Sequence, residues 1–141
     1  MEPAEDTVYT IGDWYDGPRG GAADYQGVPH WYRSVYLDRE DEPWNSDEDR
    51  FELTPLSAEA LAWERERSAI FDRWDQARKA GTVEWDGDDE THGAFPGDRE
   101  RSRELDRRME EYLAEHRPVA LVRGTFALGC KTVRWRFVHA L

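Results

Sequence analysis

Lysine and cysteine are almost absent from this chain. Lys79 and Lys131 are the only lysines among 19 basic residues, and Cys130 is the single cysteine. One cysteine excludes an intrachain disulfide and a zinc site built from cysteines. No run of about 18 apolar residues is present, and the first residues lack the basic and apolar regions of a secretory signal. We therefore expect a cytoplasmic protein that does not span a membrane.

Positive charge is also in short supply. The chain has 31 Asp and Glu against 19 Arg and Lys, which gives a formal net charge of -12 at pH 7. Neutralisation of phosphates dominates the affinity of proteins for nucleic acids, and attraction to anionic membranes has the same requirement for positive charge. We therefore expect neither direct nucleic-acid binding nor membrane binding. A basic protein is the partner that this charge favours.

Motifs for metal, cofactor and catalysis are missing as well. The chain has four scattered histidines, and none forms the spacing of a helical zinc pair: His30, His92, His116 and His139. A calcium-binding EF-hand loop requires a glutamate at its twelfth position, and the acidic stretch that starts at Asp86 has none there. We expect no metal and no cofactor, and no residue is assigned as catalytic.

Aromatic residues are what the chain has in abundance. Mean hydropathy is -0.94 and 35% of residues are charged, yet there are seven Trp, six Tyr and five Phe. Large aromatic side chains can bury enough area to offset the entropy lost on folding. The length of 141 residues fits one domain. We predict a disordered N-terminus over residues 1–6 and a single α+β domain over residues 7–141.

Runs of β-branched and aromatic residues predict four strands in the first half of the chain, over residues 7–15, 22–25, 30–37 and 51–56. Asp16–Gly21 predicts a tight reversal after the first strand, and Gln26–Gly27 predicts a turn before the third. Two more strands, over 119–128 and 132–140, are expected to form a closing hairpin.

Two helices are predicted between these groups of strands, over residues 57–80 and 98–116, with Ser57 and Asp98 as N-caps. Together with the strands they give an α+β fold. Its elements follow in the order four strands, two helices, two strands. An antiparallel sheet is expected to pack against a two-helix hairpin.

The first predicted helix has an apolar stripe with three- and four-residue spacing. We expect this stripe to pack on the sheet together with Trp135 and Phe137; it contains Trp63, Ile70, Phe71 and Trp74. Arg67 falls inside the stripe. Because an unpaired buried charge is very costly, we expect Arg67 to pair with a carboxylate.

Four side chains in the first third of the chain form a candidate cluster: Asp13, Asp16, Arg19 and His30. A carboxylate close to His30 could form an acid/base pair at neutral pH, and Arg19 could hold a small anion. The alternative is structural, with Arg19 paired to Asp13 or Asp16 and His30 bonded to a backbone carbonyl or to Asp16. We favour the structural interpretation because a lone histidine has no second fixed partner. The enzyme hypothesis needs His30 within about 8 Å of Asp16 and Arg19.

Two tryptophans lie in acidic stretches, where burial within the monomer is awkward. Trp44 precedes Asp47, Glu48 and Asp49, and Trp85 precedes Asp86, Asp88 and Asp89. Aromatic residues on a polar surface are typical interface anchors. One interpretation is a docking surface for a basic partner. The other is that these rings fold back as local anchors while the acidic residues are simply solvated.

Three short motifs resemble small uncharacterised bacterial proteins over about residues 9–80. They are Tyr-Asp-Gly-Pro-Arg at 15–19, Gly-x-Pro-His-x-Tyr at 27–32 and Leu-Thr-Pro-Leu at 53–56, followed by a Trp-containing helix. The resemblance implies a bacterial, cytosolic, single-domain protein. It carries over no activity and no site residue.

The favoured functional hypothesis is an acidic protein-interaction module that binds a basic protein. Its most concrete form is an immunity protein or antitoxin that neutralises a nucleic-acid enzyme, because such inhibitors exploit electrostatic steering. One alternative is a DNA-mimicking inhibitor of a defence system. The other is a small enzyme that acts on an anionic substrate through His30, Asp16 and Arg19.

Overall fold

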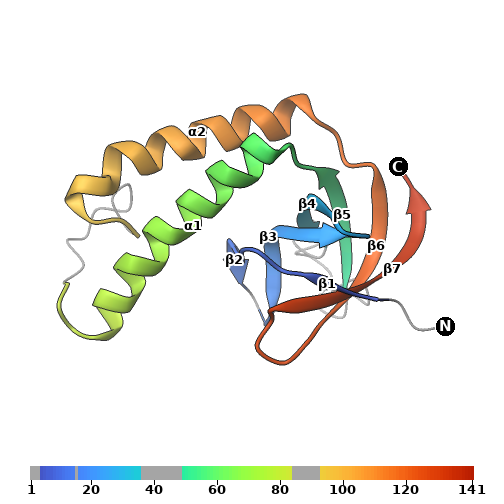
Figure 1. The fold of residues 1–141 in the computed structure, drawn as a ribbon, viewed down its shortest axis with the longest axis horizontal. Coiled ribbons are helices and arrows are strands. Elements are labelled where there is room, and N and C mark those ends of the chain that lie inside the picture. The colour runs from blue at the N-terminus through green and yellow to red at the C-terminus, as the bar shows by residue number, and fades with distance from the viewer. Residues whose placement is uncertain (1–3, 15, 36–48, 84–92) are drawn as a thin grey trace, which may run out of the picture.

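The strands form one curled antiparallel sheet beside two helices (Figure 1). A computed structural model describes residues 4–14, 16–35, 49–83 and 93–141. The strand order is β1-β7-β6-β5-β4-β3-β2. The strands are β1 (Glu5–Thr7), β2 (Asp13–Trp14), β3 (Pro18–Tyr25), β4 (Val28–Ser34), β5 (Arg50–Pro55), β6 (Ala120–Phe126) and β7 (Thr132–Ala140). Between β5 and β6 lie α1 (Ala58–Lys79), the short 3-10 helix η2 (Pro96–Asp98) and α2 (Arg99–Glu115). The predicted α+β class is confirmed.

The curl brings the two ends of the sheet together. Val8, directly after β1, forms an antiparallel bridge with Ala23 of β3. Its amide also donates to the carbonyl of Lys131, just before β7. The sheet therefore closes through the N-terminal segment. That segment includes Glu5 and Asp6, which lie within the stretch 1–6 for which the sequence predicts disorder.

The predicted first strand, residues 7–15, is interrupted. Its N-terminal end pairs with β7, and the rest runs antiparallel to β3. The amides of Tyr9 and Thr10 both donate to the carbonyl of Ala22, so the ladder has an irregularity of the bulge type at this point. The predicted reversal over 16–21 is too long, because β3 already begins at Pro18.

The turn at Gln26–Gly27 is confirmed, and its geometry explains it. Both residues have positive φ, 54° and 77°, as a two-residue hairpin turn that matches strand twist requires. The carboxylate of Asp6 accepts hydrogen bonds from both turn amides, at 3.2 and 3.0 Å. The N-terminal segment thus supports the hairpin that joins β3 and β4.

An aromatic cluster fills the inside of the curled sheet. Tyr32, Phe51, Phe126 and Trp135 lie with ring centroids 5.5–5.9 Å apart. Gly124 makes room for the indole, because a Cβ added there would collide with the Trp135 ring. Trp135 is therefore buried as expected, but inside the sheet rather than under a helix.

The helix boundaries follow from local chemistry. The Ser57 side chain accepts a hydrogen bond from the amide of Ala60, at 3.1 Å, and so caps α1. Gly81, with φ 75°, follows the end of the helix. Within the described residues, no helix is long and apolar enough to cross a membrane.

The predicted packing of the helical stripe on the sheet is only partly right. Ile70 packs with Ala94 and Leu105, which places it between the two helices. Phe71 is 47% exposed, and Phe137 of β7 is 60% exposed. A helix of 22 residues is about 33 Å long, and α1 extends beyond the sheet (Figure 1).

Candidate binding pocket

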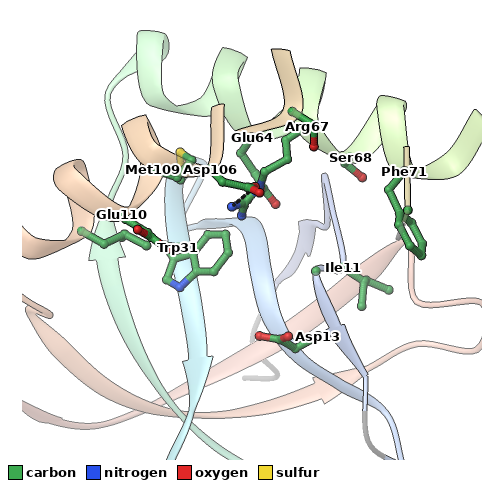
Figure 2. A pocket seen from close by; sticks show the side chains of 14 residues that line it. Ile11, Asp13, Trp31, Glu64, Arg67, Ser68, Phe71, Asp106, Met109 and Glu110 are labelled. Atoms are coloured by element: carbon green, nitrogen blue, oxygen red, sulfur yellow. Dashed lines mark hydrogen bonds and ion pairs between the residues drawn. The ribbon is translucent and has the colours of Figure 1, made fainter. Parts of the chain in front are cut away.

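A pocket of about 420 Å³ lies where the helix pair meets the edge of the sheet (Figure 2). Strand β4 contributes Trp31, and residues 11–13 form the wall on the sheet side. The two helices and Gly93, which lies just before η2, supply the rest of the lining. From α1 come Glu64, Arg67, Ser68 and Phe71, and from α2 come Ser102, Asp106, Met109, Glu110 and Leu113.

A buried carboxylate stands at the inner end of this pocket. Glu64 is only 1% exposed although it lies on a helix rich in charged residues. The hydroxyl of Thr10 donates to Glu64 Oε2 at 2.6 Å. The same hydroxyl oxygen accepts a hydrogen bond from the amide of Ala22, at 2.9 Å. The irregular ladder at Thr10 thus turns a side chain toward α1 and connects the helix to β3.

Arg67 compensates the charge of Glu64. Its Nε and Nη2 lie 2.9 and 2.7 Å from Glu64 Oε1, and its Nη1 lies 3.2 Å from Asp106 Oδ1 on α2. Its guanidinium also lies over the ring of Trp31, 5.7 Å from the centroid. The expected carboxylate partner of Arg67 is confirmed. Because the contacts reach β4, α1 and α2, this one side chain ties the helix pair to the sheet.

The pocket is acidic overall. Its described lining holds four carboxylates, those of Asp13, Glu64, Asp106 and Glu110, but only one cationic group, the guanidinium of Arg67. Asp13 on β2 and Glu110 on α2 form no ion pair with any residue in the described part of the chain. Two carboxylates on opposite walls therefore remain available to a cation.

The composition of the lining supports binding more directly than catalysis. Its described residues include the hydroxyls of Ser68 and Ser102, but among them is no histidine, cysteine or lysine that could act as a base. No group of three or more His, Cys, Asp and Glu side chains suited to a metal ion occurs in the part of the chain that the structure describes. What the pocket offers a ligand is negative charge, one indole and several apolar side chains.

His30 takes the structural role that the sequence favoured. It is 7% exposed, its Nδ1 lies 2.7 Å from the carbonyl oxygen of Val28, and its ring meets Tyr25 edge-on at 5.5 Å. Its register partner is Ala23, whereas Arg19 lies four residues earlier on β3. Four strand residues span about 13 Å, so His30 and Arg19 stand at opposite ends of the hairpin.

The other three members of the predicted cluster are also divided. Asp13 lies against Gly20 and lines the acidic pocket. Asp16 and Arg19 line a different cavity, of about 620 Å³, at one end of the curled sheet, together with Trp14 and Cys130. The structure therefore brings Asp16 near Arg19, but it does not bring His30 to either of them.

Most of the predicted docking residues lie outside the described residues. These are Trp44, Asp47, Glu48, Trp85, Asp86, Asp88 and Asp89. Asp49 is described, and both of its carboxylate oxygens accept hydrogen bonds from Arg123 Nη1, at 2.8 and 2.9 Å. Its backbone carbonyl accepts from the amide of Gly124. Asp49 therefore holds the start of β5 against β6.

Of the residues that line the acidic pocket, sequence reasoning singled out only Asp13, Arg67 and Phe71, and it assigned Arg67 and Phe71 to the helical stripe rather than to a site. One signal was present: Glu64 lies three residues before Arg67, and residues at that spacing share a helix face. Nothing local marks Trp31 or Glu110, because they reach the pocket from elements far apart in the chain. Comparisons of the chain with protein-family models, with curated protein sequences and with solved structures return no match.

Proposed function

We propose that this chain is an acidic protein-interaction module that binds a basic protein, with an immunity protein or antitoxin as its most concrete form. One observation carries the proposal: the excess negative charge is concentrated in two segments. Residues 36–48 contain six Asp and Glu and one Arg, and residues 84–92 contain five Asp and Glu and no Arg or Lys. The described residues, in contrast, carry 19 acidic and 18 basic residues.

Many charged side chains of the described residues form ion pairs with one another. Arg101 binds Glu66, Arg108 binds Glu104 and Arg107 binds Glu111, all on the helix surfaces. The electric fields of the two opposite charges in each pair nearly cancel at a distance. The net charge that an approaching protein experiences therefore comes mainly from residues 36–48 and 84–92, each of which also carries a tryptophan.

Concentrated charge of one sign accelerates association with an oppositely charged protein. Electrostatic steering can raise association rates by one to three orders of magnitude, and salt reduces the effect because exposed charges are screened beyond about 8–10 Å. Tryptophans among such charges can anchor the complex once it has formed. Fast, salt-sensitive association is what an inhibitor of a nucleic-acid enzyme needs.

The test begins with proteins captured from a lysate at low salt and released by salt. Each one is identified, purified and measured against the chain by stopped-flow and calorimetry at two salt concentrations. A variant in which all five carboxylates of 84–90 become amides should lose about ten-fold or more in association rate at low salt. The matched control converts five exposed helical carboxylates instead: Glu59, Asp72, Glu100, Glu111 and Glu115.

The proposal fails if no purified basic partner binds in a salt-dependent manner, or if the two five-residue variants lose the same factor. Two further measurements separate the forms of the function. A partner that is toxic when expressed alone, and harmless with this chain, identifies an immunity protein or antitoxin. A partner that binds DNA, and that DNA displaces from this chain, identifies a DNA mimic instead.

A further inference from the structure

We propose that the acidic pocket between the helix pair and the sheet receives an arginine side chain of the basic partner. This inference rests on the proposed function and specifies where one residue of the partner binds. The carboxylates of Asp13 and Glu110 belong to exposed residues and form no ion pair within the described part of the chain. They lie on walls formed by β2 and α2, with the indole of Trp31 between the sheet and the helices (Figure 2).

The charges of the pocket select a cation. The donors of Arg67 are already directed at Glu64 and Asp106, so an anion would find several carboxylates and no unpaired positive group among the described lining residues. A guanidinium, in contrast, can donate in two directions to carboxylates on separate walls. Gly93, the first described residue after the acidic segment 84–92, also lines the pocket.

The apolar part of the lining selects a cation with a hydrocarbon stem. Ile11, Phe71, Met109 and Leu113 line the same space, and arginine buries its methylene groups along such surfaces while its head stays polar. A volume of about 420 Å³ lies within the range of pockets that hold small ligands or side chains. A bare metal ion would leave these apolar walls unused. Lysine has the stem but not the planar fork, so arginine fits better.

The experiment uses the full chain and a defined probe, the tripeptide acetyl-Gly-Arg-Gly-amide, titrated by NMR. The indole N–H signal of Trp31 is the reporter, identified from its absence in a Trp31→Phe variant. The neutral tripeptide with citrulline in place of arginine controls for charge, and the lysine tripeptide controls for the planar fork. We expect the arginine probe to shift the Trp31 signal, and the citrulline probe to bind about ten-fold or more weakly.

Two double variants locate the site. Asp13→Asn with Glu110→Gln should weaken binding of the arginine probe about ten-fold or more, because both free carboxylates are lost. Asp72→Asn with Glu115→Gln removes the same charge from exposed positions outside the pocket and should change binding less than two-fold. Circular dichroism and thermal melts of both variants confirm that the fold is retained.

Three results would overturn the inference: no shift of the Trp31 signal with the arginine probe, equal binding of the citrulline probe, or equal weakening by the two double variants. Tighter binding of the lysine probe would refute the choice of arginine. None of these results depends on finding the partner. If the tripeptide does not bind but a purified basic protein still binds in a salt-dependent manner, the pocket assignment is wrong and the proposed function stands.

Discussion

Replacing Arg67 with methionine tests the structural tie between the helices and the sheet. Methionine keeps most of the apolar stem but removes the guanidinium that binds Glu64 and Asp106 and covers Trp31. Glu64 would then be a buried carboxylate with the hydroxyl of Thr10 as its remaining hydrogen-bond donor.

The expected cost follows from the burial of the two partners. Removing one member of a buried ion pair typically costs about 3–5 kcal/mol, because the other charge is left uncompensated. Arg67 is less buried than Glu64, with its side chain 25% exposed, so water can enter and solvate part of the orphaned carboxylate. We therefore expect a loss of about 2–3 kcal/mol, which for a chain of this length lowers the melting temperature by about 6–10 °C.

The assay is thermal and urea denaturation followed by circular dichroism, with Arg73→Met as the matched control. Arg73 lies on the same helix and pairs with Asp98 at 3.2 Å, but its side chain is 55% exposed. Exposed pairs contribute about 0–1 kcal/mol. The control should therefore melt within about 3 °C of the parent protein.

A second substitution distinguishes the loss of charge compensation from the loss of packing. Glu64→Gln keeps an oxygen that can accept from Thr10 but removes the negative charge. In the Arg67→Met background it should recover more than half of the lost stability, whereas in the parent protein it should destabilise. If Arg67→Met melts like Arg73→Met, or if Glu64→Gln recovers nothing, the network does not tie the helices to the sheet.

Three further predictions concern the sheet and the surface. Tyr32→Phe leaves a buried carbonyl without its hydrogen bond and should cost about 1–3 kcal/mol; burial raises the pKa of Tyr32, so titration of the parent at 295 nm should leave one tyrosine unionised until alkaline unfolding. Gly124→Ala places a methyl group against the Trp135 ring and should cost about 1–3 kcal/mol in urea denaturation. The hydrogen bond from Arg101 lowers the pKa of the Glu66 carboxyl. The stabilisation from this ion pair is therefore complete above the ordinary Glu pKa and is lost as pH falls through the lowered value. The stability difference between the parent and Glu66→Gln should shrink from pH 7 to pH 3.

Local features of the fold could be predicted because short stretches of sequence determine them. The turn at Gln26–Gly27 needs two residues that tolerate positive φ, and α1 begins and ends where Ser57 caps it and Gly81 stops it. The burial of Trp135 follows from the alternation of its strand. Each of these inferences depends on neighbours within about four residues.

The arrangement of the elements could not be predicted in the same way. Whether Ile70 faces the sheet or α2 depends on the angle at which the helix leaves β5, and the stripe of apolar residues is the same in both cases. The split of the first strand depends on Thr10, whose hydroxyl bonds to Glu64, 54 residues away. Glu64 itself lies in a run of charged residues that is typical of a solvated face.

The candidate site shows the same division. Arg67 could be expected to have a carboxylate partner because it interrupts an apolar stripe, and it has two. Closeness in sequence could not place the cluster of Asp13, Asp16, Arg19 and His30. Two residues of a hairpin lie close together when they face each other across the strands, but far apart when they lie at its two ends. The pocket is formed by β2, β4, α1 and α2, and only the tertiary fold brings these together.

The network around Arg67 and the proposed arginine site are mechanically linked. Asp13 belongs to the sheet and Glu110 to the helix pair, so the distance between their carboxylates depends on how the helices are held. The contacts of Arg67 with Glu64, Asp106 and Trp31 are among those that fix this relation. Arg67→Met should therefore weaken binding of the arginine tripeptide even below its melting temperature, although it removes a positive charge from an acidic pocket. Electrostatics alone predicts the opposite sign, so a tighter Kd for this variant would show that the pocket does not need the tie.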